Sequence, residues 1–260
     1  MDTHDIAKLL QTVAEAVIRP RFRALAPDQI FLKGPGDYVT VADRQAEVEL
    51  TRALNQAFPD ALVVGEEAAA DQPDLARGLE RPEHVFVVDP VDGTGNFVRG
   101  DPDYAVMVGE LRHGQATRGW IWQPEHGLSY VGQLGAGVER NGHLLPPLQP
   151  LARSGRHPVG QVSRSRLVGR CADSLARPLA RSRGCAGVDY TRLLEAQVDF
   201  IAYKPPKPWD HVPGALMLRE LGGVARLTNG AEYIGQLSPH DLIVAADPAT
   251  WAVAQAVVRG

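Results

Sequence analysis

The sequence is poor in cysteine, with two among 260 residues, and its N-terminal segment has no long apolar run. Cys171 and Cys185 are too few for a disulfide framework and do not form a metal-binding pair, so we expect a reducing compartment. The charged residues Asp2, Asp5 and Lys8 interrupt the first turns, and we therefore expect neither a signal peptide nor a membrane span. Both features predict a cytoplasmic protein without a membrane partner.

The sequence also lacks a strong charge of either sign. Its net charge is -4 and its isoelectric point is about 6.1, which gives no electrostatic footprint for nucleic acid binding. An arginine-rich stretch from Arg153 to Arg183 is interrupted by small and apolar residues. We interpret this stretch as a solvated basic face.

Hydrophobic residues make up 44% of the chain, whose mass is 28.1 kDa. A chain of this size can bury a sizeable core, as one large domain or as two tightly joined lobes. A proline-rich stretch at 146–150 separates the two halves. We expect an N-terminal lobe over residues 1–150 and a C-terminal lobe over 151–260 that together form one compact unit.

The most informative stretch is residues 89–97, which follows an apolar run at 85–88 that predicts a buried strand. Asp89 and Asp92 are separated by a proline-containing turn, so both carboxylates can point into one cavity. Like charges in one cavity repel unless a cation holds them, and hard divalent cations prefer oxygen ligands. Taken alone, each dipeptide Asp-Pro or Asp-Gly is also a common turn former.

Backbone N–H groups and further acids surround this stretch. Gly93 and Thr94 lie at an expected helix start, where N–H groups can bind a phosphate. Another short apolar strand ends in Glu66, and an apolar helical stretch follows Asp210. Asp210 is expected either to cap that helix or to bind a ligand.

The remaining pattern predicts the other elements. Apolar spacing predicts a first helix over 6–17 and a second helix that begins at Thr40. The second helix is expected to bury Val48, Leu50, Ala53 and Leu54. Residues 30–37 form a short turn-rich segment, and residues 68–84 form a polar connection. We expect an antiparallel meander at 104–110, 117–123 and 128–132, then helices at 190–196 and 248–258 and strands at 198–203 and 242–246. This order predicts an α+β fold.

The acid-bearing segments resemble the inositol monophosphatase family of magnesium-dependent, lithium-sensitive phosphatases. The resemblance rests on residues 65–67, 89–97 and 209–215, supported by 33–43, by 135–137 and by 141–142, and it spans most of the chain. It implies an α-β-α-β-α sandwich, a homodimer, a small phosphorylated substrate and two to three Mg²⁺ ions in the active site. Two cations about 3.5–4 Å apart can assist an in-line displacement at phosphorus.

The resemblance also implies roles for single residues. Metal ligands would be Glu66, Asp89, the carbonyl of Val91, Asp92 and Asp210, and Asp89 would bridge two ions. Catalytic roles would fall to Glu66 and to Thr94, whose hydroxyl would activate water through a hydrogen bond to Asp43. Asp43 also stands three residues after Thr40, so it is alternatively a capping-box residue. The hydroxyl of Thr94 is alternatively a local cap.

The substrate contacts implied by the resemblance are Asp92, Gly93, Thr94, Ala186, Tyr203 and Asp210. Inositol-specific members place a glutamate where this chain has Tyr203, so this position departs from the inositol-type pattern. The substrate expected from the resemblance as a whole is inositol 1-phosphate or a similar small polyol phosphate. The alternatives are 3′-phosphoadenosine 5′-phosphate, histidinol phosphate and fructose 1,6-bisphosphate. Lys204 and Lys207 could favour a second anionic group, or they are solvent-facing loop charges. A member that mainly binds a macromolecular partner is the alternative from another class.

Overall fold

The structure is a computed structural model. It describes residues 1–72, 74–75, 79, 83–150, 158–162 and 179–259. Cys171, most of the arginine-rich stretch and part of the 68–84 connection lie outside the described residues. In the part of the chain that the structure describes, we find no helix long and apolar enough to cross a membrane.

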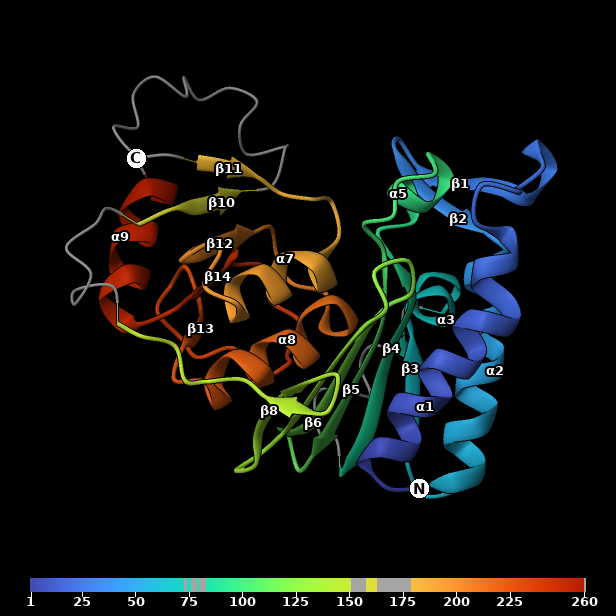
Figure 1. Ribbon diagram of the computed structural model, residues 1–260, viewed down its shortest axis with the longest axis horizontal. Coiled ribbons are helices and arrows are strands. Elements are labelled where there is room, and N and C mark those ends of the chain that lie inside the picture. The colour runs from blue at the N-terminus through green and yellow to red at the C-terminus, as the bar shows by residue number, and fades with distance from the viewer. Residues whose placement is uncertain (73, 76–78, 80–82, 151–157, 163–178, 260) are drawn as a thin grey trace.

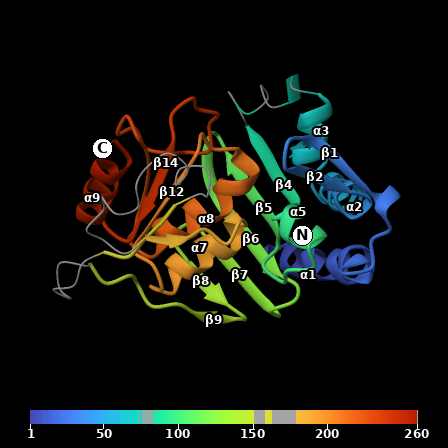
Figure 2. The same ribbon diagram turned by 90° about the horizontal axis from the view of Figure 1, so that it is seen from above.

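Helices and sheets alternate in layers across the molecule (Figure 1). Helices α1 (Thr3–Val13) and α2 (Val41–Ala57) cover the outer face of a seven-stranded sheet. Helices α7 (Ala186–Leu194) and α8 (Pro208–Glu220) lie between this sheet and a five-stranded sheet, and α9 (Pro248–Arg259) covers the far side (Figure 2). The α+β fold and its α-β-α-β-α layers are as predicted.

The large sheet has its strands in chain order, β3 to β9. They are β3 (Leu62–Gly65), β4 (His84–Asp92), β5 (Ala105–Arg112), β6 (Gln115–Gln123), β7 (Leu128–Gln133), β8 (Gly137–Arg140) and β9 (His143–Leu144). The pair β3 and β4 is parallel and every later pair is antiparallel, so the predicted meander is confirmed and extended by β8 and β9.

The smaller sheet has the order β11-β10-β12-β14-β13. Its strands are β10 (Gly160–Val162), β11 (Leu179–Arg181), β12 (Phe200–Tyr203), β13 (Val224–Leu227) and β14 (Leu242–Ala245). Successive side chains on β12 face opposite sides, as a pleated strand requires. Ile201 therefore packs toward α7 and α8, while Phe200 packs toward α9.

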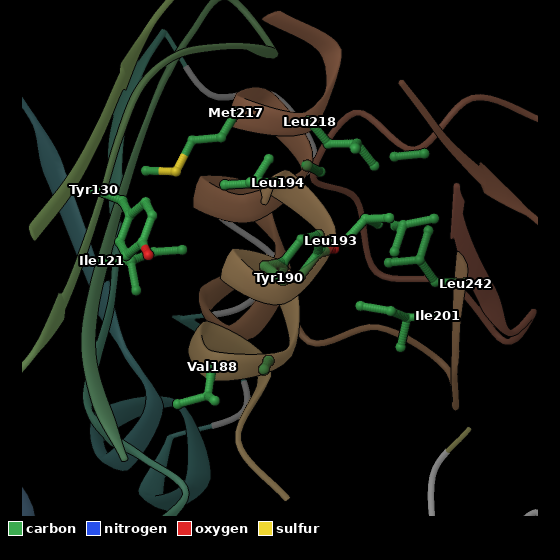
Figure 3. Close-up of a cluster of buried hydrophobic side chains, with 14 of the residues drawn as sticks. Ile121, Tyr130, Val188, Tyr190, Leu193, Leu194, Ile201, Met217, Leu218 and Leu242 are labelled. Carbon is green, nitrogen blue, oxygen red and sulfur yellow. The ribbon is translucent and has the colours of Figure 1, made fainter. Parts of the chain in front are cut away.

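The middle layer is packed from both sides (Figure 3). Ile121 and Tyr130 reach the helices from the large sheet, and Ile201 and Leu242 reach them from the small one. All four side chains are buried. Burial of each large apolar side chain stabilises the fold by about 1.5–3 kcal/mol, so this core joins the two sheets into one structure.

A row of glycines lets α8 approach the large sheet closely. Gly109, Gly119 and Gly132 are direct neighbours on β5, β6 and β7. A Cβ atom on them would come within 2.7 Å of Val212, 2.8 Å of Pro213 and 2.7 Å of Met217. The glycine row thus fixes the position of α8 and of the acid near its start.

Some predicted elements differ from the observed ones. Residues 30–40 form a hairpin of β1 (Ile30–Gly34) and β2 (Asp37–Thr40) rather than a loop, with Gly36 in the left-handed region at its turn. Val48 on α2 is 63% exposed, because the apolar stripe runs along Ala46, Leu50 and Leu54 instead. Helix α7 begins at Ala186, four residues before its predicted start.

Candidate active site

The carboxyl ends of β3 and β4 lie side by side because these strands are parallel. Their register pairs Gly65 with Val88, so the next residues, Glu66 and Asp89, are neighbours at the same edge of the sheet. After Asp89 the ladder with β5 shifts register before it resumes at Asp92. The sequence places an acid at each of these two strand ends, and the structure brings Glu66 and Asp89 together.

Helix α8 brings the third acid. Asp210 is the third residue of this helix and not its N-cap, because Pro208 already occupies the first helical position after Lys207. The capping interpretation of Asp210 is therefore wrong. Ligand atoms of Glu66, Asp89 and Asp210 all lie within 4.8 Å of one another, which is close enough for one cation to bind all three.

Charge repulsion within this cluster is strong. Burial raises the pKa of Asp89 well above its usual value, and the negative charges of Glu66, Asp92 and Asp210 add to the effect. Burial, Glu66 and Asp92 likewise raise the pKa of Asp210. A divalent cation would remove this repulsion, so the donor set fits a hard metal ion.

Asp92 points toward the start of α7. Its Oδ2 atom accepts hydrogen bonds from the backbone N–H of Gly187 at 2.6 Å and from the Sγ of Cys185 at 2.9 Å. A carboxylate is favourable there because it satisfies free N–H groups and complements the helix dipole. The fold thereby ties Asp92 to the segment that carries Ala186, one of the predicted substrate contacts.

Thr94 and Asp43 form the predicted hydrogen bond, with 2.9 Å between Thr94 Oγ1 and Asp43 Oδ1. The same hydroxyl lies 2.9 Å from the carbonyl oxygen of Val91. Gly93, with φ of 85°, precedes the short helix α5 (Thr94–Val98). Burial raises the pKa of Asp43 to about 6, against the opposing effect of its hydrogen bonds from Thr40 and Thr94.

Two lysines contact Glu66. Lys33 Nζ on β1 lies 2.9 Å from Glu66 Oε1 and 3.0 Å from Glu67 Oε1. Lys207 Nζ lies 3.3 Å from the same Glu66 oxygen while its side chain stays 48% exposed, so Lys207 both faces solvent and contacts the cluster. Burial would raise the pKa of Glu66, but the charges of Lys207 and Lys33 outweigh it and lower this pKa.

Sequence reasoning missed Glu47, which supports the site from α2. Its buried carboxylate accepts hydrogen bonds of 2.8 Å from the N–H groups of both Glu67 and Ala68, at the start of α3 (Glu66–Asp71). A Cβ atom on Gly65 would come within 2.1 Å of this carboxylate, which explains the glycine. Glu47 stands four residues after Asp43, on the same helix face among apolar residues, and this spacing was the available signal.

Tyr203 lies at the end of β12 and packs against aromatic neighbours. Its ring centroid is 5.5 Å from that of Tyr190, in a stacked arrangement, and 4.5 Å from that of His211. Burial lowers the pKa of His211 to about 3, so this ring is neutral. The ring of Tyr203 thus packs between α7 and α8, beside His211, which directly follows Asp210 in the chain.

Comparison with known proteins adds independent information. A sequence model of a protein family, described as the inositol monophosphatase family, matches residues 2–259 of the chain. The chain belongs to the inositol monophosphatase family. Members are metal-dependent phosphatases, so this family member is a phosphate ester hydrolase.

Relatives of known name are similar over most of their length. The chain is 29% identical over 258 residues to the "Fructose-1,6-bisphosphatase/inositol-1-monophosphatase" of Aquifex aeolicus, covering 92% of this chain and 93% of that protein. It is 27% identical over 210 residues to the "Nus factor SuhB" of Vibrio cholerae, covering 78% and 76%. The solved structure of a Thermotoga maritima IMPase has a TM-score of 0.81 at 22% identity, covering 100% of this chain and 96% of that one, and so has the same fold.

Proposed function

We propose that this family member is a Mg²⁺-dependent phosphomonoesterase that hydrolyses inositol 1-phosphate or a similar small polyol phosphate. The observation that carries the proposal is the meeting of Glu66, Asp89 and Asp210 within 4.8 Å at one edge of the large sheet. Such a set of carboxylate oxygen donors binds the hard cation Mg²⁺ in preference to softer metal ions. The small phosphorylated substrate agrees with the family.

The cation site would be built from the predicted ligands. Glu66, Asp89 and the Val91 carbonyl would hold one Mg²⁺, and Asp89, Asp92 and Asp210 a second, with a third near Glu66. When bound, Mg²⁺ neutralises phosphate oxygens and lowers the pKa of water. The raised pKa values of Asp89 and Asp210 support this set, because ionised carboxylates in such a cluster need a counter-charge.

Thr94 and Asp43 would orient and deprotonate the attacking water. With a pKa of about 6, Asp43 is mostly ionised at neutral pH and can accept the proton of Thr94 Oγ1. The lone pair of that hydroxyl is then available to accept a proton from water, a general-base role that contributes about 10²–10⁴-fold in rate. Glu66 would assist as a charged neighbour of the same water.

The phosphate would bind to the N–H groups of Gly93 and Thr94, and the alcohol part of the substrate would contact Asp92, Ala186 and Asp210. Tyr203, whose ring packs on Tyr190 and His211, would support this pocket by packing rather than by a hydrogen bond to the substrate. The hydrogen bonds from Cys185 and Gly187 to Asp92 support this arrangement, since they fix Asp92 beside Ala186. The name of the Aquifex aeolicus relative favours fructose 1,6-bisphosphate among the alternatives. The other two alternatives, 3′-phosphoadenosine 5′-phosphate and histidinol phosphate, belong in the same assay.

A second candidate function is binding to a macromolecular partner, with phosphatase activity as a side reaction. The similarity to a protein named Nus factor favours it. The intact acid cluster favours catalysis, so we place binding second.

Further properties carried by the resemblance are part of the same proposal. The protein would be a homodimer, which sedimentation can test, and millimolar Li⁺ would inhibit it. It would be located in the cytoplasm, which cell fractionation can test. Its two lobes, 1–150 and 151–260, would act as one catalytic unit. A calorimetric melt tests the last of these, since a single cooperative unit unfolds in one transition.

The deciding experiment is a panel of phosphate esters assayed for released phosphate with Mg²⁺ and with EDTA. We expect inositol 1-phosphate or another polyol monophosphate to have the highest kcat/KM, and EDTA to abolish release. A bisphosphorylated or nucleotide ester with the highest kcat/KM would instead select one of the alternative substrates.

A further inference from the structure

A separate cavity of about 620 Å³ lies beside α5 and β11. Four arginines line it: Arg99 after α5, Arg181 at the end of β11, Arg183, and Arg192 on α7. The sequence predicts a solvated basic face for the stretch that ends at Arg183. Arg181 and Arg183 are both exposed, and they also contribute to a concave surface, where several charges can act on one ligand.

Buried polar residues hold the wall of this cavity in place. The Nδ2 atom of buried Asn96 donates to the carbonyl oxygens of Asp103 at 2.6 Å and Arg183 at 2.8 Å. Buried Asp189 accepts from the N–H of Arg183 at 2.9 Å and from the hydroxyl of Ser182 at 2.5 Å. The segment 182–184 is therefore fixed before any ligand binds, which lowers the entropic cost of binding.

Three of the four guanidinium groups in the cavity, those of Arg99, Arg181 and Arg192, keep their charge available. Arg99 donates to the amide oxygen of Asn96 at 2.6 Å, and Arg192 donates to the amide oxygen of Gln161 at 3.0 Å. Both acceptors are neutral. Within the described residues, neither these two arginines nor Arg181 forms an ion pair with a carboxylate.

Two acids also line the cavity, and both already have partners. Asp103 lies 2.9 Å from the ring of His126 and 3.6 Å from Arg183. Asp101 accepts the N–H of Asp103 at 3.0 Å. Four arginines against two aspartates leave an excess of positive charge, so the cavity favours an anion.

The cavity adjoins the predicted phosphate site. Gly184 lines the cavity, and its carbonyl oxygen would be 3.4 Å from a Cβ atom on Gly93. Asn96, which also lines it, follows Thr94 by two residues on the same short helix. The arginine cavity is thus adjacent to the residues that would hold the reacting phosphate.

We propose that this arginine cavity binds a second phosphate-class anion. Guanidinium groups match phosphate oxygens with paired N–H donors, and an anion with two charges suits several of them. The anion could come from two sources. One is the remote phosphate of a bisphosphorylated substrate, and this assignment rests on the proposed function. The other is free inorganic phosphate, and this assignment is independent of the proposed function.

The first test measures inorganic phosphate binding to the full-length protein by calorimetry in EDTA, where the carboxylate cluster repels anions. We expect Arg181→Gln and Arg99→Gln each to weaken binding about tenfold, the effect of losing one charge-assisted hydrogen bond. Arg52→Gln on α2, which pairs only with Glu49 among its described neighbours, is the charge-matched control and should bind as wild type does. Unchanged affinity in both cavity variants, or an equal loss in the control, would overturn the proposal.

The second test identifies the source of the anion. It compares kcat/KM for fructose 1,6-bisphosphate with that for inositol 1-phosphate, using wild type and Arg181→Gln with Mg²⁺. A tenfold fall in this ratio assigns the cavity to the substrate, whereas an unchanged ratio together with weaker phosphate binding assigns it to free phosphate. If phosphate binds in EDTA and no ester is hydrolysed, the proposed function fails while the cavity assignment stands.

Discussion

Asp43 connects two helices through Thr94. One oxygen of the carboxylate accepts the hydroxyl of Thr94 at 2.9 Å, and the other accepts the N–H of Thr40 at 2.9 Å as part of the capping box of α2. The sequence offered capping and partnership with Thr94 as alternatives for Asp43. The structure contains both contacts, because an ionised carboxylate has two oxygens that accept independently.

Replacing Thr94 by valine tests the water-activating role. The substitution keeps the shape and removes the hydroxyl, so we expect kcat to fall at least about 100-fold. Calorimetric Mg²⁺ affinity should change little, since the carboxylates remain. Thr94→Ser keeps the hydroxyl and should recover most of the rate; a kcat for Thr94→Val within a few-fold of wild type would remove the residue from the mechanism.

Removing the charge of Lys207 should strengthen metal binding. Its ammonium group shares Glu66 Oε1 with Lys33 and thus competes with a cation for that oxygen. One partly exposed charge at this range is worth on the order of 1 kcal/mol, so Lys207→Met should lower the Kd for Mg²⁺ about fivefold. Lys204→Met, likewise exposed in the same loop and without a contact to Glu66 among the described residues, is the control. Equal Kd values for both variants would show that Lys207 does not compete.

Tyr203→Glu should destabilise the protein without restoring inositol selectivity. The new carboxylate would replace a ring that packs on Tyr190 and beside His211, whose neutral ring offers no positive charge. Loss of this packing should cost about 3 kcal/mol of unfolding free energy, whereas Tyr203→Phe keeps the ring and should cost much less. A tenfold gain in kcat/KM for inositol 1-phosphate over a bisphosphate, with the fold intact, would instead place Tyr203 in the substrate pocket.

The contacts of Glu110 with Arg118 predict that part of the free energy of unfolding is lost in acid. Burial would raise the pKa of Glu110, but the hydrogen bonds and charge of Arg118 outweigh burial and lower it to about 2. A depressed carboxylate pKa contributes stability above the unfolded value of 4.5, and this contribution is lost as the pH falls toward 2. It amounts to about 3 kcal/mol.

Urea unfolding at several pH values checks this account of Glu110. Wild type should be more stable than Glu110→Gln at pH 5, and the difference should shrink as the pH falls to 2. The variant Glu49→Gln, which removes a more exposed carboxylate, controls for the general effect of charge. A difference for Glu110→Gln that stays constant with pH would contradict the assignment.

Local patterns were sufficient for the elements that surround the acids. The apolar run 85–88 predicted β4, the turn signals predicted the meander, and the glycine and acid after each run marked the strand ends. The helix starts at Ala186 and Pro208 were missed, because the first is fixed by contact with Asp92 and the second by a proline that was assigned to the loop. The start at Ala186 thus depends on a tertiary contact, and the start at Pro208 depends on a single residue of the preceding turn.

Long-range polar contacts could not be predicted. The contacts of Lys33 and Lys207 with Glu66 join residues 33 and 141 positions apart, and no local pattern marks them. The same holds for the glycine row under α8, whose members become neighbours through strand register alone. Glu47 was within reach, because a second acid at i+4 on an apolar helix face indicates a buried polar role.

The central claim is that the carboxylate cluster holds the cation needed for hydrolysis, and Asp89→Asn tests it most directly. Asp89 is buried within the cluster, and its amide replacement would bind cations poorly while relieving repulsion. Phosphate release from the best substrate of the panel should fall below about one thousandth of the wild-type rate at saturating Mg²⁺, while the melting temperature in EDTA stays equal or rises. Release within a few-fold of wild type by the folded variant would contradict the account.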